Sequence, residues 1–445
     1  MNVNEIVKYA INTGFDDAIA ELDDYITYYV KIINSKPESI LKGSLKVYSL
    51  FLRKGKKVTI KLIEDMKKED YLNFLNRVKH EISSKPDSEF YGINELKTKY
   101  KPIGGDKKIA NLDSNELIDI SYSSINGSLD NGATRVDGTL SFSYSYYELA
   151  SSKGISGKDS ESKVRISLRA FNERFSSQIT ASSRMLKDID PYDAGKEAAS
   201  FLQLTNKIGR ISNGIYDIIY LPSPGGSLLY NVDIAAAIGN VESGSFLKGK
   251  LNQKIANEAL SIYDDGCNKK GIGNIAFDDE GYPTQRTPII KDGELINYLF
   301  NTSKAIKYNK KSTGNAGIIE PQPNIMDIEF KKVASLEDMI KEVKKGILVT
   351  NTWYTRFRSF QEGIFSTVPR DVTFYIENGE IKFGIKEVGY AKNIVGIRIT
   401  DSIPHMLNSI ELSSKNKELA TSWEVEGEYY FAPAILTREA HVTVA

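Results

Sequence analysis

Cysteine and histidine are scarce in this chain of 445 residues. Its single cysteine, Cys267, excludes an intramolecular disulfide and fits a reducing compartment. The three histidines are scattered at positions 80, 405 and 441. His80-Glu81 is followed by isoleucine, two serines and a lysine, so the second histidine of a helical HExxH zinc motif is missing. The sequence therefore offers no histidine-based metal site.

The chain also lacks an excess of charge and a long apolar run. Basic and acidic residues number 58 each, which argues against a general surface for nucleic acid. No apolar run approaches the length of a membrane-spanning helix, and the N-terminal stretch lacks the apolar core of a signal peptide. With 41% hydrophobic residues, the composition is that of a globular protein. We expect a cytoplasmic protein that binds neither nucleic acid nor membrane.

Periodicity predicts three segments. Residues 1–95 mix short helices with strands, and residues 114–206 contain alternating strands followed by a helix. The lysine- and glycine-rich stretch 96–113 is predicted to link them. Residues 214–445 are β-rich, with hairpin signals such as Asn378-Gly379. We expect an α+β protein with a mixed N-terminal part and a β-rich C-terminal domain built on a curved antiparallel sheet or partial barrel.

Two shorter stretches lead to definite local predictions. The serine- and glycine-rich tract 151–162 is predicted to be a flexible loop between strands. Residues Ser227–Ile238 are predicted to form one helix with an apolar side, after a break at Pro222–Gly226.

A hairpin preceded by an acidic turn is predicted within the C-terminal segment. Thr287–Lys291 and Glu294–Phe300 are β-rich runs, and Asp292-Gly293 between them can supply the positive φ of a tight turn. The preceding Phe277–Gly281 is predicted to be a solvated acidic turn. Its three carboxylates could attract a hard cation, but one short run has no cage spacing, so a structural turn is favoured.

These pieces occur in a recognisable order. FDDEG, TQRT, the short DG hairpin, Ser312–Gly317 and Phe374–Ile381 resemble the TldD/PmbA (TldE) family over about residues 210–445, and more loosely upstream. The resemblance implies a relation to metallopeptidases whose catalytic members carry an HExxxH helix. In those members the two histidines bind zinc and the glutamate acts as general base.

The positions that resemble HExxxH are degenerate here. They are occupied by Tyr230, Asn231 and Ala235. Tyrosine and alanine offer no imidazole nitrogen, and an asparagine cannot accept a proton as a carboxylate does. The catalytic type also has a late cysteine in a glycine-rich stretch, whereas the comparable region 424–437 has none. We expect no catalytic residue, metal ligand or cofactor in this chain, which places it on the PmbA/TldE side, with zinc in a partner subunit.

The resemblance implies a function with two alternatives for the partner. The favoured one is a non-catalytic TldE/PmbA-like subunit of a TldD/TldE-type metallopeptidase, which acts on unfolded or short peptides beside a TldD-like HExxxH homologue. The second is a homodimer that binds peptides without cleaving them. A third idea, modulation of DNA gyrase, comes from the family's historical name, and the neutral charge balance gives it no support as direct DNA binding.

Arginines beside aromatic residues are the candidates for peptide binding. Arg356 and Arg358 lie in the run Thr352–Arg358, and Arg370 follows it. An arginine can bind a peptide carboxylate with two parallel hydrogen bonds. The resemblance implies that this loop and the following hairpin line the cavity that peptide enters, although the same residues also suit a surface loop.

Overall fold

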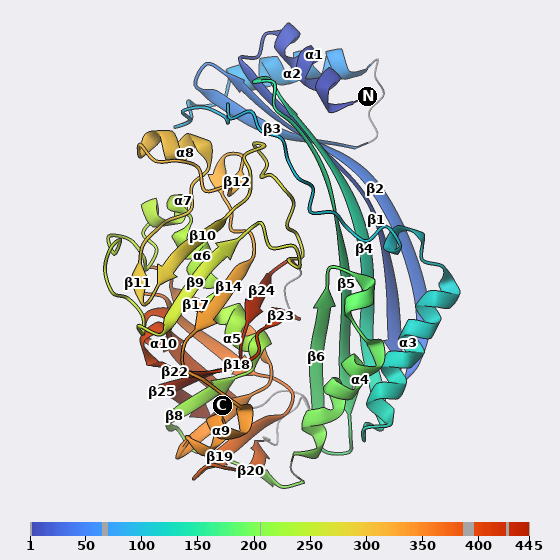
Figure 1. The fold of residues 1–445 in the computed structure, drawn as a ribbon, viewed down its shortest axis with the longest axis vertical. Coiled ribbons are helices and arrows are strands. Elements are labelled where there is room, and N and C mark those ends of the chain that lie inside the picture. Colours follow the sequence, from blue (N-terminus) through green and yellow to red (C-terminus); the bar gives the residue numbers. More distant parts are fainter. Residues whose placement is uncertain (1, 65–69, 205, 386–395, 424–426, 445) are drawn as a thin grey trace.

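The computed structural model describes residues 2–64, 70–204, 206–385, 396–423 and 427–444. A long curved sheet built from the N-terminal half faces a C-terminal body of sheets and short helices (Figure 1). Helices and strands occur in both halves, so the predicted α+β class is confirmed. No helix in the described part of the chain is both long and apolar enough to cross a membrane.

The curved sheet is antiparallel throughout and has the order β3-β2-β1-β4-β5-β6. Its strands are β1 (Asp17–Ile33), β2 (Lys36–Lys54), β3 (Lys57–Glu64), β4 (Arg135–Ser151), β5 (Ser156–Phe171) and β6 (Ser176–Ser183). Pairing of β1 with β4 joins strands of the first two predicted segments in one sheet. The boundaries 1–95, 114–206 and 214–445 stay a prediction.

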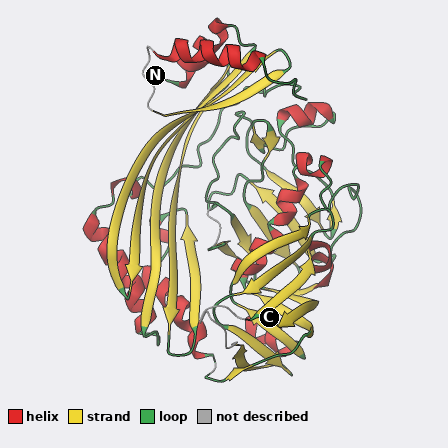
Figure 2. Cartoon of the chain, turned by 180° about the vertical axis from the view of Figure 1, so that it is seen from behind, coloured by secondary structure: helices red, strands yellow, loops and turns green. Residues whose placement is uncertain are grey.

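Helices cover the curved sheet at both ends (Figure 2). The helices α1 (Val3–Thr13) and α2 (Tyr71–Ser83) pack at one end, and α3 (Ser114–Leu129) and α4 (Pro191–Ser200) cover the convex side at the other. Gly127 and Gly195 let α3 and α4 touch, because a Cβ at either position would lie within about 2.0 Å of an opposing carbonyl oxygen. The buried Leu140 and Phe142 of β4 belong to the core on this side.

The C-terminal body contains two larger sheets and one β-ribbon in the described part of the chain. An eleven-stranded sheet runs β17-β18-β21-β25-β8-β16-β19-β20-β7, with β22 beside β25 and β15 beside β22. It includes the parallel pairs β16·β8 and β20·β7. A six-stranded sheet has the order β11-β10-β9-β14-β24-β23. The apolar core of the body includes residues of both sheets and of the helices α5 and α6.

The strands of the body are β7 (Ile208–Gly209), β8 (Gly214–Tyr220), β9 (Leu260–Asp265), β10 (Arg286–Lys291), β11 (Glu294–Leu295), β12 (Ala316–Gly317), β13 (Glu320–Pro321), β14 (Met326–Phe330), β15 (Val333–Ala334), β16 (Lys345–Val349), β17 (Thr352–Ser359), β18 (Ile364–Pro369), β19 (Thr373–Glu377), β20 (Glu380–Ile385), β21 (Ile397–Ser402), β22 (Ile410–Ser414), β23 (Glu418–Thr421), β24 (Tyr429–Ala432) and β25 (Ile435–Val444). Its helices are α5 (Pro222–Leu229), α6 (Asn231–Ala236), α7 (Ile238–Glu242), α8 (Thr302–Lys307), α9 (Leu336–Lys341) and α10 (Ile403–Ser409). Short 3₁₀ turns among the described residues include η2 (Ile109–Asn111), η3 (Leu186–Asp188) and η4 (Phe201–Gln203).

Local sequence signals succeeded at turns and failed where tertiary pairing decides. The hairpin turn after β10 is confirmed, with φ of 50° at Asp292 and 81° at Gly293, but its second strand covers Glu294–Leu295 and does not extend to Phe300. The loop predicted over 151–162 is wrong, because β5 begins at Ser156 and the polar tract pairs with β4. The solvated turn is also wrong, since Phe277, Asp278 and Glu280 are buried.

The helix predicted over Ser227–Ile238 is divided. The first helix, α5, begins at Pro222, because proline fits the first turn, where its missing N–H is not needed. Tyr230 separates α5 from α6, and Ala237, with φ −57° and ψ 124°, separates α6 from α7. Residue 230 therefore lies at a junction between two short helices.

Candidate functional site

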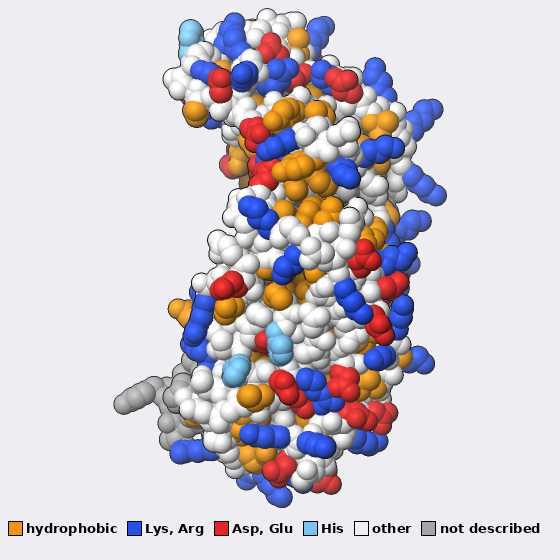
Figure 3. Space-filling model, turned by 90° about the vertical axis from the view of Figure 1, so that its left-hand side faces the viewer, with side chains coloured by type: hydrophobic (Ala, Val, Ile, Leu, Met, Phe, Trp, Pro, Cys, Tyr) orange, Lys and Arg blue, Asp and Glu red, His pale blue; other side chains and the backbone are white. Residues whose placement is uncertain are grey.

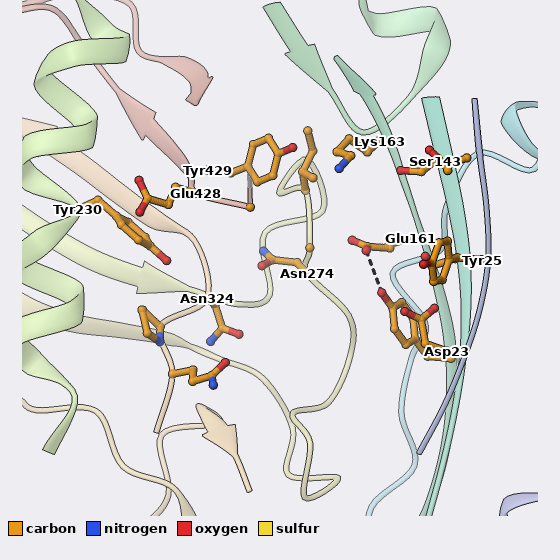
Figure 4. Close-up of a pocket in the computed structure, with 18 of the residues that line it drawn as sticks. Asp23, Tyr25, Ser143, Glu161, Lys163, Tyr230, Asn274, Asn324, Glu428 and Tyr429 are labelled. Carbon is orange, nitrogen blue, oxygen red and sulfur yellow. Dashed lines mark hydrogen bonds between the residues drawn. The ribbon is translucent and has the colours of Figure 1, made fainter. Parts of the chain in front are cut away.

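A cavity of about 660 Å³ lies between the concave face of the curved sheet and the C-terminal body. Side chains of β1, β4 and β5 form one wall (Figure 4). The opposite wall comes from the α5–α6 region and from the stretches 272–274, 322–324 and 427–429. Residues 424–426, which belong to the region compared with the late cysteine, lie outside the described residues.

Strand alternation makes the sheet wall polar. In an antiparallel sheet every second residue points to the same face. Asp23, Tyr25, Thr27 and Tyr29 of β1 therefore share the concave face, opposite Ser143, Ser145 and Tyr147 of β4 and Glu161 and Lys163 of β5. The register places Tyr25 opposite Ser145, and Ser145 opposite Glu161. Residues of β1 and of the β4–β5 hairpin, which are far apart in the sequence, thus form one continuous wall.

Two carboxylates dominate the electrostatics of this wall. The Tyr147 hydroxyl donates to Glu161 Oε1 at 2.9 Å (Figure 4). Burial raises the pKa of Asp23 to about 6, and the neighbouring Glu161 charge adds to this shift. Burial also raises the pKa of the Tyr147 hydroxyl well above its ordinary value. This wall therefore presents neutral hydroxyls around a pair of repelling carboxylates.

Of the three degenerate zinc-motif positions, Tyr230 lines the cavity, with its ring toward the open space (Figure 4). Burial, and then the charge of Asp233, raises the pKa of its hydroxyl. Asn231 instead donates its side-chain amide to the carbonyl oxygens of Ser227 and Leu228, at 3.1 and 3.0 Å. Ala235 is fully buried in the core of the body. The roles predicted for these positions stay predictions.

Two aspartates behind Tyr230 were not predicted from the sequence. Asp233 is fully buried, and neither of its carboxylate oxygens has a hydrogen-bond partner among the described residues. Asp264 accepts from the amides of Asn315 and Asn324, while burial raises its pKa to about 6. The sequence did carry a signal for these two buried acids. Asp233 interrupts the apolar helical run NVDIAA, and Asp264 lies in the apolar strand LSIYDD.

Arg184 and Asp159 bind the loop 271–276, which we call the cavity loop, to the curved sheet. The sequence did not predict a role for either residue. Arg184 Nη1 donates to the carbonyl oxygens of Gly271 and Asn274 at 2.6 and 2.8 Å. Asp159 Oδ2 accepts from the backbone N–H of Ile103 and Ala276, at 3.0 and 2.8 Å. Most of these partners are backbone groups about 50 to 120 residues away, which side-chain patterns do not indicate.

The three candidate arginines lie away from this cavity. Arg356 and Arg358 are exposed on β17, the end strand of its sheet in the described part of the chain, and Arg356 lies 4.3 Å from the Tyr354 ring centre. Arg370 is mostly buried, 4.2 Å from the Trp423 ring centre and 3.9 Å from an Asp371 oxygen. None of the three lines the described cavity wall. Their predicted peptide contacts stay a prediction.

Charge is mixed on the outer surface. Basic and acidic side chains are interspersed on the face shown in Figure 3, as expected for a chain with no net charge.

Among the residues that the structure describes, no group of three or more histidine, cysteine, aspartate or glutamate side chains is arranged to hold a metal ion.

Comparison with known proteins places this geometry in a family. The profile described as the PmbA/TldA metallopeptidase C-terminal domain matches residues 213–444. An uncharacterized protein of Methanocaldococcus jannaschii is 26% identical over 339 residues, covering 72% of this chain and 76% of its own length. Escherichia coli metalloprotease PmbA is 32% identical over 170 residues, which cover 36% of this chain and 34% of PmbA.

Solved structures match over nearly the whole chain. TldE of Thermococcus kodakarensis superposes with a TM-score of 0.84 at 18% identity, covering 99% of both chains. A Thermotoga maritima protein superposes with a TM-score of 0.82 at 19% identity, again covering 99% of both. At these identities the likeness concerns the fold. Since the C-terminal domain profile covers more than half of the 445 residues, the chain belongs to the PmbA/TldD family of metallopeptidases.

Proposed function

We propose that this chain is a TldE/PmbA-like subunit of a TldD/TldE-type metallopeptidase. It holds an unfolded or short peptide, while a TldD-like partner with an intact HExxxH helix supplies the zinc. The observation that carries the proposal is the α5–α6 junction, where Tyr230 faces the cavity at the position that the family resemblance assigns to a zinc ligand. Ala235, at the second histidine position, has no donor atom and is fully buried.

The cavity suits an extended peptide rather than a small rigid ligand. Its volume of about 660 Å³ lies within the usual range of ligand pockets. Its sheet wall carries hydroxyl and carboxylate groups in a row along paired strands, which can accept hydrogen bonds from successive peptide groups. Arg356, Arg358 and Arg370 remain candidates for a second contact with a peptide carboxylate, outside this cavity.

Metal content is the first test of this proposal. The purified chain is expected to hold no stoichiometric zinc, because tyrosine, asparagine and alanine do not replace the His-Glu-His set. Elemental analysis should be run beside an HExxxH homologue prepared in the same way. One tightly bound zinc per chain, lost in a Tyr230→Phe/Asn231→Ala variant, would overturn the proposal.

A homodimer that binds peptide without cleaving it is the second candidate. Its support is that both walls of the cavity come from this single chain, so no partner is needed to form it. Co-purification from the native host separates the two candidates. Recovery of a stable HExxxH homologue favours the peptidase subunit, whereas recovery of homodimer alone favours the peptide-binding protein.

A further inference from the structure

The peptide cavity combines aromatic rings with carboxylates. Asp23 and Glu161 lie on the sheet wall, and Glu428 lies across from them on the body wall (Figure 4). Tyr25 and Tyr147 line the same wall as these two carboxylates. Tyr147 lies opposite Asp23 in the register of β1 and β4. Lys163 is the one cationic side chain among the described residues that line the cavity. The lining is therefore acidic and aromatic, although the whole chain carries no net charge.

The two sheet-wall carboxylates are incompletely satisfied. Asp23 Oδ1 and Glu161 Oε2 are buried atoms that have no hydrogen-bond partner among the described residues. Among the described residues, no lysine or arginine forms an ion pair with Asp23 or Glu161. Leaving a buried acceptor without a donor costs free energy. A ligand with several N–H donors and a positive charge would satisfy both oxygens.

Two carboxylates on the opposite face of the same sheet are paired. Asp24 of β1 lies 3.3 Å from Lys46 Nζ, and Glu148 of β4 is bonded to Lys158 Nζ at 2.5 Å. The alternation of the strands places these two acids on the other side of the sheet from Asp23 and Glu161. Among the described residues, the lack of an ion pair is thus particular to Asp23 and Glu161 on the cavity face and is not general to the acids of this sheet.

An ammonium group matches this environment in both charge and shape. A protonated amine has three donors and no acceptor. It can approach two carboxylates at once, and tyrosine faces attract cations through the ring quadrupole. Pairing with the ligand would also remove the repulsion between Asp23 and Glu161, which contributes to the raised pKa of Asp23.

We propose that Asp23 and Glu161 form a subsite for a protonated amine of the bound peptide. The amine is either a lysine side chain or a free N-terminal amine, and both have the same chemistry at this subsite. This inference rests on the proposed function, because it names the group by which the peptide is held. It predicts a preference for cationic peptides that backbone contacts alone would not produce.

Peptide affinity measured by fluorescence anisotropy tests the subsite. Three probes are pentapeptides with a C-terminal fluorophore: an acetylated peptide with a central lysine, the same peptide with norleucine, and the norleucine peptide with a free N-terminus. The protein variants are wild type, Asp23→Asn/Glu161→Gln, and Asp24→Asn. The last is a matched control, because it removes one charge from the same strand on the opposite face.

The wild type is expected to bind the lysine probe or the free-amine probe about tenfold more tightly than the capped norleucine probe. The double variant should lose this preference, while Asp24→Asn should keep it. Comparison of the lysine and free-amine probes tells which amine occupies the subsite. Equal affinity of the wild type for all three probes overturns the subsite and leaves peptide binding intact. Failure of every probe to bind instead overturns the proposed function, and the subsite falls with it.

Discussion

At the scale of single residues, Arg184 shows how one buried side chain joins the two halves of the molecule. It is 2% exposed. Its guanidinium donates to the carbonyl oxygens of Gly104 and Ser160, on one side, and to those of Gly271 and Asn274, in the cavity loop. Arginine suits this place because its planar fork directs several donors at fixed angles. The position of the loop wall therefore depends on this side chain.

Replacing Arg184 should destabilise the protein. Arg184→Ala leaves four carbonyl groups without this donor, two of them in buried hydrogen bonds, so the free energy of unfolding should fall by about 3 kcal/mol. Arg184→Lys should recover only part of this loss, since an ammonium cannot reach all four oxygens. Urea denaturation measures both, with exposed Arg358→Ala as the control. An Arg184→Ala stability equal to that of the control would contradict this role.

Arg370 and Arg356 should respond differently to truncation, although both were predicted as peptide contacts. Arg370 lies against Trp423 and beside Asp371, whose side chain is fully buried. Its replacement by alanine should lower the free energy of unfolding by about 1–2 kcal/mol, because packing and a buried charge contact are lost. Exposed Arg356→Ala should change it by less than about 0.5 kcal/mol.

Thermal or urea unfolding of these two single variants decides this point. Peptide affinity measured on the folded variants then tests the predicted contact separately. Equal stability of both variants would show that the Trp423 and Asp371 contacts of Arg370 contribute little.

At the scale of elements, the acidic turn Phe277–Gly281 is a buried connector. Asp278 accepts from the backbone N–H groups of Glu280, Tyr282 and Ala316. Glu280 accepts from the N–H of Thr302, at the start of α8. Burial raises the pKa of Asp278 to about 7 and that of Asp279 to about 6, and raises that of Glu21 on the adjacent β1. The turn thus buries acids that gain a charge near neutral pH.

Stability should therefore fall as the pH rises. An unfolded aspartate has a pKa of about 4, whereas these folded carboxyls hold their protons up to about pH 6 to 7. The folded state binds more protons in this window, so its stabilisation is complete below about pH 4 and is lost as the pH passes through 6 to 7. Urea denaturation between pH 5 and 8 measures this slope.

Asp279→Asn should flatten the slope, because the amide does not ionise. Asp338→Asn is the matched control, since burial does not hold Asp338 neutral and its pKa is lowered by Lys341. A wild-type free energy of unfolding that rises over this window would contradict the account of the turn.

Elements were predictable where neighbours in the sequence determine them. Asp292-Gly293 carries its own turn signal, and the alternation of β4 gave Leu140 and Phe142 one face. The start of β5 was missed, because the polar tract 156–162 has no apolar alternation and becomes a strand through its pairing with β4. Asp23 and Glu161 could not be paired from the sequence, because their proximity depends on the register of three strands. Tyr230 was identified through family resemblance alone.

At the scale of the whole molecule, the proposed function divides the work of a peptidase between two subunits, this chain and its partner. Under the proposed function, zinc held by a partner subunit would lower the pKa of a bound water and polarise the scissile carbonyl. The cavity of this chain would supply the other requirement, which is to hold a flexible peptide in an extended form. Because backbone groups are the same in every peptide, such a division permits cleavage of many sequences.

The central claim is that this chain supports peptide cleavage without performing it. The direct test is a cleavage assay on unfolded or short peptides with this chain alone, with its HExxxH homologue alone, and with the mixture. The proposal predicts no cleavage by this chain alone and chelator-sensitive cleavage by the mixture that exceeds that of the homologue. Robust chelator-sensitive cleavage by this chain alone, or a mixture no more active than the homologue, would contradict it.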